Sequence, residues 1–261
     1  MRSLADPVSV PELWGVGLYD ADVPYPVSQR DVDRDTAGAS AALQRLGVAA
    51  GDHVLFVSRF AEAAQFWPFE RAAVELGAVF SCADTGPGEA ARVALFLRLL
   101  PMSLVAGVTP ATLAGLRDLG LHPGEVLGAA RLVLARPGAR EELAAEGLSA
   151  GRIDLLGPAV AIGCAADRLH VDGAEWVLAG DGGRVAVSAR HDRAAAVAGH
   201  DTGVAGRVLD RCPCGWPGQA VEPAEPAEPA EPVSGPAGPA PAGPAPAGSA
   251  PTGSAPPGGR P

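Results

Sequence analysis

Short apolar runs alternate with helical stretches between residues 28 and 156, and this alternation limits the possible folds more than any other feature of the chain. Strands that alternate with helices at this spacing predict a mostly parallel, doubly wound α/β sheet with helices on both faces. The connections between these strands should be right-handed. The expected strands are His53–Val57, Ala78–Cys82, Ser103–Ala106, Arg131–Leu134 and Ile153–Leu156.

Capping residues, prolines and glycines mark the ends of the expected helices. Ser28 is a favourable N-cap, and Asp31 follows it in the first turn of a helix that should end at Gly47. Thr109 should cap another helix, which begins at Pro110. The other helical stretches are Ala61–Leu76, with a kink or late start at Pro68, a helix opened by Pro87, and Glu141–Glu146.

The pattern changes after residue 156 to short β runs separated by glycines, which predicts a small β-rich lobe over residues 157–220. Within it, Asp181-Gly182-Gly183 has the composition of a hairpin turn. Residues 1–27 contain several prolines and few periodic apolar positions, so an N-terminal arm or loop is expected. Residues 221–261 are rich in Pro, Ala and Gly and have nothing to bury, so we expect a disordered, solvated tail.

Charge and composition restrict the classes of partner. A formal net charge of -10 and the lack of a basic stripe argue against nonspecific binding to nucleic acid or to an anionic membrane. All 20 Lys and Arg positions are arginine, so mechanisms that need a lysine ammonium group are excluded. No window approaches the roughly 20 apolar residues that cross a bilayer, and no leader pattern is visible, so a cytoplasmic protein is expected.

Three of the four cysteines and one histidine have the spacing of two short metal-binding loops. Cys164 precedes His170, and Cys212-Pro213-Cys214 is followed by Gly215, which allows a tight turn. Thiolate and imidazole ligands in a Cys3His set are typical of a closed structural zinc site, which would tie together the two ends of the β-rich lobe. The alternative is a chance set of buried cysteines and a surface histidine.

Two other groups contain residues that can carry chemistry. Cys82 ends an apolar run, so a small core residue is expected there rather than a nucleophile. His200 and Asp201 lie in the Gly-rich segment Gly199–Gly203, where an aspartate could orient a histidine as a general base. An ordinary surface turn is the preferred interpretation of that segment.

From Val27 to Gly218 the chain resembles the phenylacetate-CoA ligase branch of the adenylate-forming (AMP-dependent synthetase/ligase) enzymes. The order of the similar segments along the chain supports the resemblance more than any one of them. These segments are Ser28–Asp33 with Leu46–Asp52 (the helix before the "PGD" strand), Glu70–Val79 ("aERlGAtVIP"), Val108-Thr109-Pro110 ("TPS"), Gly157–Cys164 ("GPGVAxEC"), Asp201-Thr202-Gly203 ("RYRTGD"), and the Cys/His set, which matches a zinc site of some members.

The resemblance implies chemistry and ligands. Members of the family activate a carboxylic acid with ATP, form an acyl-adenylate and then a CoA thioester, so ATP and CoA are implied as cofactors. The positions that match the family's binding segments are the candidate substrate-binding residues. They are Thr109, Pro110, Gly157, Pro158, Asp201 and Thr202.

The sequence departs from the family pattern at four places. Residues Trp14–Asp22 stand where the family has a Ser/Thr/Gly phosphate loop of the form "SSGTTGKP", and they contain no hydroxyl cluster and no lysine. Ile153–Leu156 runs directly into Gly157, which leaves no place for the "YGLSE" motif and its magnesium-binding glutamate. Val204 occupies the position of the ribose-binding aspartate. Asp201, three residues earlier, is a candidate replacement, but a solvated turn carboxylate is the preferred interpretation. The lid with its catalytic lysine has no counterpart.

These departures leave several functions open. The leading interpretation is a degenerate, non-catalytic homologue that serves as a zinc-stapled module for binding a small molecule or a protein, with no catalytic residue assigned. The alternative is a reduced acyl- or aryl-CoA ligase that is active with a partner chain. A scaffold in a biosynthetic or catabolic complex, with the proline-rich tail as a spacer, is a third interpretation. A zinc hydrolase is less suitable, because a Cys3His shell leaves no open coordination position.

Overall fold

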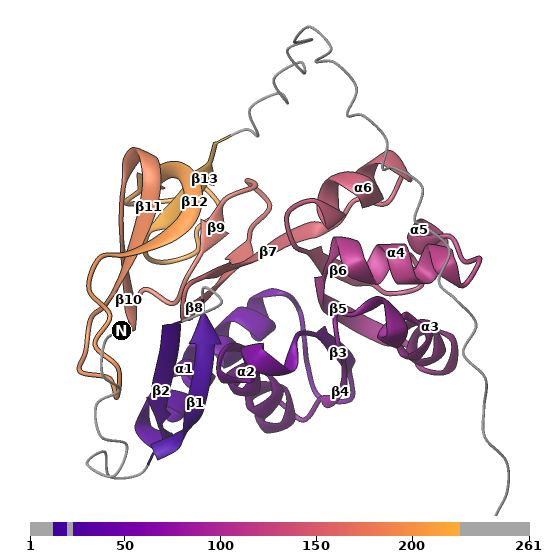
Figure 1. Ribbon diagram of the computed structural model, residues 1–261, viewed down its shortest axis with the longest axis horizontal. Coiled ribbons are helices and arrows are strands. Elements are labelled where there is room, and N and C mark those ends of the chain that lie inside the picture. The colour runs from indigo at the N-terminus through magenta and orange to yellow at the C-terminus, as the bar shows by residue number, and fades with distance from the viewer. Residues whose placement is uncertain (1–12, 20–22, 225–261) are drawn as a thin grey trace, which may run out of the picture. The chain divides into compact units, whose positions relative to one another are not determined.

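A single sheet of eleven strands forms the centre of the molecule in the computed structural model, which describes residues 13–19 and 23–224 (Figure 1). The strand order is β10-β11-β12-β13-β9-β8-β7-β6-β5-β3-β4. The strands from β4 to β7 are parallel, and every pairing from β7 to β10 is antiparallel. The predicted mixed α/β class is therefore confirmed.

The parallel part lies where the alternating pattern predicted it. Each strand comes from an apolar run between two helical stretches, and β5 is buried along its whole length. The chain leaves β3 toward β4 and returns to β5 on the other side of β3, so the winding changes direction there. The bounds are β3 His53–Val57, β4 Val79–Ala83, β5 Met102–Val108, β6 Leu132–Ala135 and β7 Gly151–Leu156.

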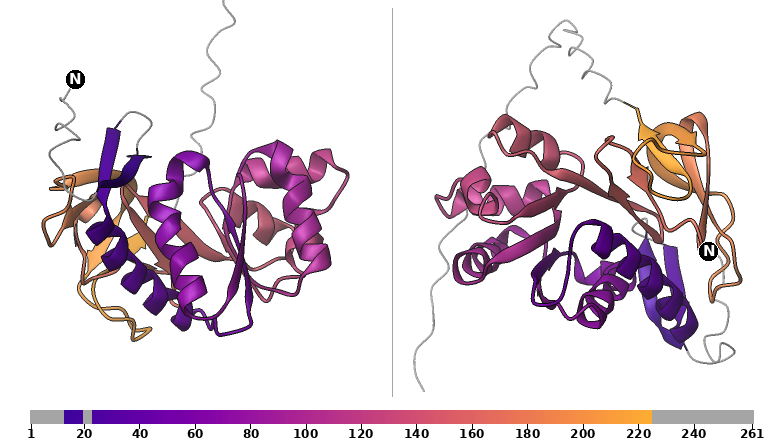
Figure 2. Two further views of the ribbon diagram at one scale, coloured as in Figure 1. Left: turned by 90° about the horizontal axis from the view of Figure 1, so that it is seen from below. Right: turned by 180° about the vertical axis from the view of Figure 1, so that it is seen from behind.

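Helices cover both faces of this parallel part (Figures 1 and 2). Successive side chains of a strand point to opposite faces, so β3 contributes Val54 and Phe56 to the core beneath α1 and α2. Leu55 and Val57 enter the core beneath α3 to α6. The bounds are α1 Gln29–Arg45, α2 Ala63–Glu75, α3 Ala90–Leu99, α4 Pro110–Asp118, α5 Pro123–Leu127 and α6 Ala139–Ala145, with 3-10 turns η2 Phe60–Glu62 and η3 Pro87–Glu89.

The predicted helix caps form. Ser28 and Asp31 make a capping box at the start of α1, in which the Ser28 backbone N–H donates to the Asp31 carboxylate at 2.9 Å. Thr109 caps α4, whose first residue is Pro110. Pro68 lies inside α2, which begins two residues later than expected because η2 precedes it.

The antiparallel part follows a two-residue turn after β7. Gly157 and Pro158 join β7 to β8, and the paired residues next to the turn are Leu156 and Ala159. Residues 28–156 and 157–220 therefore share one continuous sheet, with β7 in both the parallel and the antiparallel part. The bounds are β8 Ala159–Gly163, β9 Leu169–His170, β10 Trp176–Ala179, β11 Asp181–Ala189, β12 His200–Leu209 and β13 Ala220–Pro223.

The segment predicted as an arm forms a hairpin where it is described. Strands β1 (Leu13–Tyr19) and β2 (Val23–Ser28) pair in antiparallel fashion directly before α1. Pro24 and Pro26 indicate a loop by composition, but they are two residues apart, and among the described strands β2 pairs with β1 alone. Both missing N–H groups can therefore face the unpaired edge of the strand, where proline is tolerated.

Asp181-Gly182-Gly183 lies in the connection of the β10–β11 hairpin, between the paired residues Ala179 and Ala186, and it also begins strand β11 because Asp181 pairs with β12. Two expectations for the second half were wrong in detail. The Gly-rich segment at His200 is the start of β12 instead of a surface turn. Val221 to Pro223, assigned to the tail, belong to β13, which pairs with β12 and β9. The remaining predictions for residues 1–12 and 225–261 lie outside the described residues.

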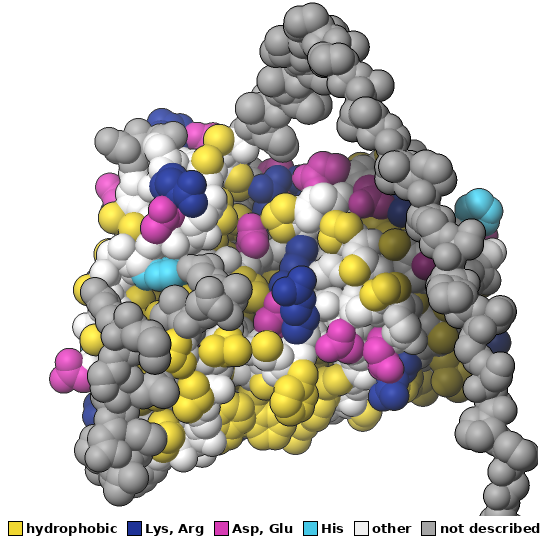
Figure 3. Space-filling model, in the orientation of Figure 1, with side chains coloured by type: hydrophobic (Ala, Val, Ile, Leu, Met, Phe, Trp, Pro, Cys, Tyr) yellow, Lys and Arg dark blue, Asp and Glu magenta, His cyan; other side chains and the backbone are white. Residues whose placement is uncertain are grey.

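One face of the molecule carries mixed charges and an apolar area (Figure 3). On the face shown in Figure 3, arginine and acidic side chains are interspersed, and hydrophobic side chains gather over the lower part, where Figure 1 places the β1–β2 hairpin and α2. Trp14, Val16 and Leu18 of β1 are 37%, 52% and 42% exposed. None of the helices in the described part of the chain is long and apolar enough to span a membrane.

Candidate metal centre and adjoining cavities

The first two candidate ligands lie on either side of a tight turn between β8 and β9. Cys164 follows β8 directly, and its backbone N–H donates to the Arg168 carbonyl at 2.9 Å. Asp167 has a φ of 55°, a conformation that a short polar residue tolerates. The turn brings the chain back to His170 on β9, which pairs with Ile162 of β8 and is only 2% exposed.

The other two candidate ligands lie in the connection between β12 and β13. Gly215 has a φ of +78°, which glycine adopts without strain, and its N–H donates to the Cys212 carbonyl at 3.3 Å. The N–H of Trp216 donates to the Cys214 sulfur at 3.3 Å. The tight turn predicted at Gly215 therefore forms and directs both thiols to the same side.

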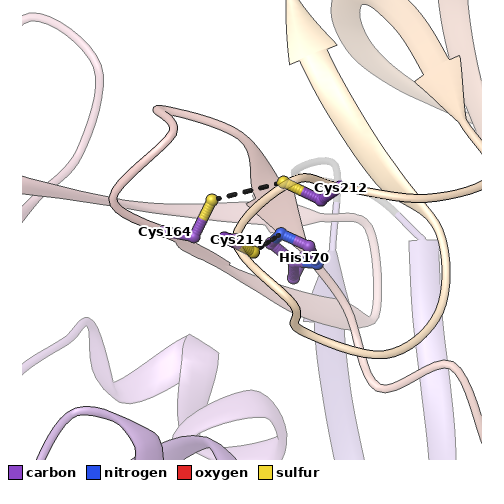
Figure 4. Close-up of side chains that lie close together, drawn as sticks. All are labelled: Cys164, His170, Cys212 and Cys214. Atoms are coloured by element: carbon purple, nitrogen blue, oxygen red, sulfur yellow. Dashed lines mark hydrogen bonds between the residues drawn. The ribbon is translucent and has the colours of Figure 1, made fainter.

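The structure brings all four predicted metal ligands together (Figure 4). Their sulfur and nitrogen atoms lie within 4.8 Å of one another, with 3.7 Å between the sulfurs of Cys164 and Cys212 and 3.4 Å between Cys214 Sγ and His170 Nε2. None of the cysteines is in a disulfide. A tetrahedral ion with Zn–S bonds of about 2.3 Å and a Zn–N bond of about 2.0 Å separates such donors by about 3.5 to 3.8 Å. The cluster therefore fits a metal ion of this size.

The electrostatic environment of the cluster favours the neutral imidazole of His170 and the thiolate of Cys164, which are the forms that bind a metal ion. Burial lowers the pKa of His170, as does the nearby Arg45 guanidinium, so the imidazole is kept neutral. Burial tends to raise the pKa of Cys164, but N–H groups of Arg168 and Ala166 and the two other thiols outweigh it and lower that pKa. Burial raises the pKa of Cys214 to about 11. A bound cation would deprotonate such a thiol directly.

Trp216 covers the histidine of the cluster, a role that sequence reasoning missed. Its ring stacks on His170 with centroids 5.0 Å apart and planes 9° apart, and the Arg45 guanidinium lies 5.5 Å from its centroid. A signal was present in the sequence, since Trp216 follows Cys214-Gly215 immediately in a chain with only four tryptophans. The packing holds the His170 ring in place and shields one side of the cluster.

A cavity of about 400 Å³ begins beside the cluster and runs between α1, α2 and β8. Its lining is largely apolar, with small residues such as Ala39 and Ala42 of α1 facing Val160 and Ile162 of β8. His170 and Trp216 line one end. Sequence reasoning missed this cavity, because its wall is assembled from four segments that are far apart in the chain.

A smaller cavity of about 240 Å³ lies at the other side of Gln65, next to the β1–β2 hairpin. Tyr19, Glu62 and Gly157 line it with Gln65. Glu62 accepts two hydrogen bonds from Arg136, at 2.8 and 2.6 Å. Gln65 is the one residue that lines both cavities.

The six candidate substrate-binding residues do not form one site. Gly157 lines the smaller cavity and Pro158 the larger one. Thr109 and Pro110 line neither, and the Thr109 hydroxyl instead caps α4 beside the Thr85 carbonyl. Asp201 and Thr202, on β12, also line neither cavity.

Asp201 and its neighbours have structural contacts. The Asp201 carboxylate forms an exposed ion pair with Arg184 at 2.7 Å, and the Thr202 hydroxyl donates to the Val185 carbonyl at 2.7 Å. The ring of His200 lies edge-on to Tyr19, with centroids 4.7 Å apart. Its Cδ2 atom would lie 2.5 Å from a Cβ at position 157, so only glycine fits there.

Comparison of the fold gives relatives that comparison of the sequence does not. No protein-family model and no curated protein matches the sequence. A solved structure of 2-hydroxyisobutyryl-CoA ligase in the postadenylation state has a TM-score of 0.64 and 17% identity, over 85% of this chain and 53% of that one. The open conformation of the same ligase, in complex with 2-HIB-AMP and CoA, has a TM-score of 0.63 and 16% identity. The match covers 81% of this chain and 53% of the ligase chain.

The described fold is similar to about half of the fold of these acyl-CoA ligases. At this identity the likeness shows the fold alone, which is consistent with an adenylate-forming ligase-like fold and does not identify the phenylacetate branch. The chain spans about half the length of the ligases it matches. Ligands and activity of those enzymes therefore bear on this chain only as hypotheses.

Proposed function

We propose that this chain is a small-molecule-binding module that has the acyl-CoA ligase fold, holds a structural zinc ion and does not form acyl-adenylates. In this proposal ATP and CoA, the cofactors of the ligases, are not its ligands. The binding site is the cavity of about 400 Å³ between α1, α2 and β8. Mostly apolar cavities of this size are typical of sites for small organic molecules.

The observation that carries the proposal is the turn between β7 and β8. Leu156 pairs with Ala159, so only Gly157 and Pro158 join the two strands. The family places its magnesium-binding glutamate in a motif directly before this Gly-Pro pair. The pairing is continuous up to the turn, which supports the proposal that the chain has neither this motif nor its glutamate ligand for the magnesium ion that accompanies ATP.

The hairpin before α1 supports the same conclusion. The segment that corresponds to the family's phosphate loop contains strand β1, whose Trp14, Val16 and Leu18 are apolar and exposed. Backbone N–H groups bind phosphate when successive residues turn them toward one point, which an extended strand paired with β2 does not do. Val204, at the position of the ribose aspartate, lies within β12 and has no hydrogen-bonding side chain.

The zinc ion in this proposal has a structural role. Three thiols and one imidazole occupy all four positions of a tetrahedral shell, which leaves none for water or substrate. The ligands join the β8–β9 turn to the connection between β12 and β13. Zinc would neutralise the thiolates and crosslink the antiparallel part of the sheet.

Calorimetric titration with ATP and magnesium tests the absence of adenylation. We expect no saturable heat of binding. The preparation should carry one equivalent of zinc and show a cooperative unfolding transition, and these two properties control for misfolding. A parallel assay should detect no pyrophosphate release with a panel of aliphatic and aromatic acids. Micromolar ATP binding with acid-dependent pyrophosphate release would refute the proposal.

The likeness to the ligases favours one second candidate. This candidate is a reduced acyl- or aryl-CoA ligase that is active with a partner chain, which would supply parts of a ligase outside the 53% that the match covers. Such a partner would belong to a biosynthetic or catabolic complex in the cytoplasm. Co-purification followed by assay with ATP, CoA and the acid panel separates the candidates, because only a completed ligase would yield a thioester.

A further inference from the structure

The backbone of His170 is fixed by its strand, but its ring needs a separate restraint. β9 lies between β8 and β13, and His170 pairs with Ile162 of β8 and with Ala220 of β13. These pairings hold the Cα atom of His170. They do not set the rotation of the imidazole about its Cβ–Cγ bond, which has broad minima in histidine. Another contact is therefore required to keep Nε2 directed at the three thiols.

The hydrogen bond that usually supplies this restraint is missing among the residues that the structure describes. A metal-ligating histidine normally donates its second ring N–H to a carboxylate, a carbonyl or a water molecule, which fixes the orientation of the ring. Nε2 of His170 lies 3.4 Å from Cys214 Sγ, so Nδ1 is the second nitrogen. Nδ1 is buried and has no hydrogen-bond partner in the described part of the chain.

The indole of Trp216 provides a restraint of another kind. It lies nearly parallel to the imidazole of His170, with ring centroids 5.0 Å apart and planes 9° apart. Rotation of the imidazole out of this plane would drive its atoms into the indole. The stack therefore opposes the same rotation that a hydrogen bond from Nδ1 would oppose.

Trp216 is itself held from several sides. Its backbone N–H donates to Cys214 Sγ at 3.3 Å, and the Arg45 guanidinium lies 5.5 Å from the centroid of its ring. The indole is partly buried and packs against the core beneath α1 and α2. Trp216 thus connects the Cys212–Cys214 half of the cluster with the half that contains His170.

The larger cavity makes this restraint more important. His170 and Trp216 both line its end beside the cluster, and the cavity has a volume of about 400 Å³. Removal of the indole would extend this space to the face of the imidazole. A side chain that borders open space is not confined by the close packing that fixes side chains in a protein interior.

We propose that Trp216 is a positioning residue of the metal centre, whose stack on His170 takes the place of the missing hydrogen bond and raises the affinity for zinc. The inference rests on the structural zinc of the proposed function and adds what determines how tightly the ion is held. Loss of an outer partner of a ligating histidine weakens metal binding by about 10- to 100-fold. We expect the lower end of this range, because two strands hold the His170 backbone.

Competition with a chromophoric chelator measures the affinity of the full chain for zinc. Trp216→Leu keeps an apolar side chain but removes the ring, so it should bind zinc about tenfold more weakly. Trp216→Phe keeps a ring and should recover most of this loss. Trp14→Leu is the matched control, because Trp14 also stacks on a ring, that of Trp67 at 6.2 Å, but lies outside the cluster. Its zinc affinity should equal that of the unmodified chain.

Substitution of zinc by Co²⁺ separates positioning from packing. The thiolate-to-cobalt charge-transfer bands should be the same in Trp216→Leu and the unmodified chain, because all three cysteines remain. The ligand-field bands, which depend on the arrangement of all four ligands, should shift in Trp216→Leu and be restored in Trp216→Phe. A residue that only packs would lower the free energy of unfolding and change neither these bands nor the zinc affinity of the folded chain.

Proton NMR of the unmodified, zinc-loaded chain tests the premise and does not depend on whether a variant folds. The Nδ1 proton of His170 should exchange slowly with water and lack the strong downfield shift of a hydrogen-bonded imidazole N–H. A strong downfield shift would overturn the inference, as would equal zinc affinity of Trp216→Leu and the unmodified chain, or an equal loss in Trp14→Leu. An unmodified chain that binds no zinc would instead refute the structural zinc of the proposed function.

Discussion

The parallel and antiparallel parts of the sheet are stabilised in different ways. From β4 to β7, helices cover both faces, and the largest fully buried side chains of this part are aliphatic or aromatic, such as Leu104 and Phe56. From β8 to β13, no helix of the described chain follows α6, so these strands pack on the hairpin and on α1 and α2. Two polar crosslinks reinforce this second part, the metal cluster and a buried arginine.

Arg193 is the buried arginine. It precedes β12, its side chain is fully buried, and it contacts carboxylates of Asp35 and Glu175, the latter at 3.2 Å. Its Nε donates to the Tyr25 hydroxyl at 2.8 Å, and its guanidinium lies 4.5 Å from the centroid of Trp176. These contacts join the antiparallel part to α1 and β2. Apolar packing therefore stabilises the parallel part, where helices enclose the sheet. In the antiparallel part, specific polar crosslinks supplement the apolar packing.

Removal of the metal should lower the stability of the antiparallel part more than any other change. For Cys212→Ser we expect loss of zinc and a decrease in the free energy of unfolding of at least about 5 kcal/mol, because metal binding energy is folding energy in a closed site. Hydrogen exchange should show the loss of protection concentrated in β8 to β13. Urea denaturation and metal analysis of the purified variant measure both effects.

Cys82→Ser is the matched control for this substitution. Cys82 lies in β4, outside the cluster, so zinc should be retained and the free energy of unfolding should fall by only about 1 kcal/mol. Equal zinc content in the Cys212 variant and the control would show that the cluster does not hold the metal. Uniform loss of protection across all strands would show that the two parts of the sheet do not differ.

Substitution of the buried arginine should have the next largest effect. Arg193→Met removes the charge but keeps much of the apolar stem. It leaves the Asp35 carboxylate without the cation that the structure pairs with it, and it leaves Glu175 with Arg34 as its remaining cation. Breaking a buried ion network in this way costs about 3 to 5 kcal/mol. Burial already raises the pKa of Asp35 despite the contact with Arg193, so loss of the arginine should raise that pKa further. Urea denaturation at neutral pH measures the change in stability.

Arg184→Met is the matched control for Arg193→Met, because it removes an arginine from an exposed ion pair instead of a buried one. Arg184 and Asp201 also lie in the antiparallel part, but their side chains are 66% and 57% exposed. Exposed pairs contribute about 0 to 1 kcal/mol, so this variant should be nearly as stable as the unmodified chain. Similar losses for the two variants would mean that burial does not determine the contribution of Arg193.

The sequence predicted those features that depend on neighbouring residues. The strands of the parallel part were found because continuous apolar runs such as Leu104–Val108 are buried on both faces. The helix starts at Ser28 and Thr109 were found because caps are local. The metal cluster was found because cysteine and histidine are rare, and their spacing within each loop is short.

Features that depend on distant contacts were missed. The sequence of the β1–β2 hairpin favours a loop, because Pro24 and Pro26 are acceptable only on an edge and pairing partners are not visible in the sequence. The glycines at the start of β12 favour a turn. The environment of Arg193 joins residues 158 positions apart, and the Gln65 side-chain amide donates to a carbonyl 92 positions away.

Ionisation of Cys82 should have the smallest effect on the free energy of unfolding, and this effect is absent at neutral pH. Burial, the negative charge of Glu70 and a hydrogen bond to its carboxylate raise the pKa of the Cys82 thiol to about 12. An unfolded thiol with the ordinary pKa of 9 releases its proton first, so ionisation favours the unfolded state as the pH rises from 9 toward 12. The free energy of unfolding should therefore be unaffected by this group below pH 9 and decrease above it.

Comparison with Cys82→Ser isolates this contribution, because the variant lacks the titrating thiol but keeps the other groups. The difference in stability between the two proteins should change with pH only above pH 9. Alkylation gives an independent measure, since only the thiolate reacts, and Glu70→Gln should accelerate alkylation of Cys82 by lowering its pKa. A constant difference from pH 7 to 11 would show that Cys82 titrates like an exposed thiol. The apolar part of the sheet would then not keep its single cysteine protonated, in contrast to the cluster, where backbone N–H groups lower the pKa of Cys164.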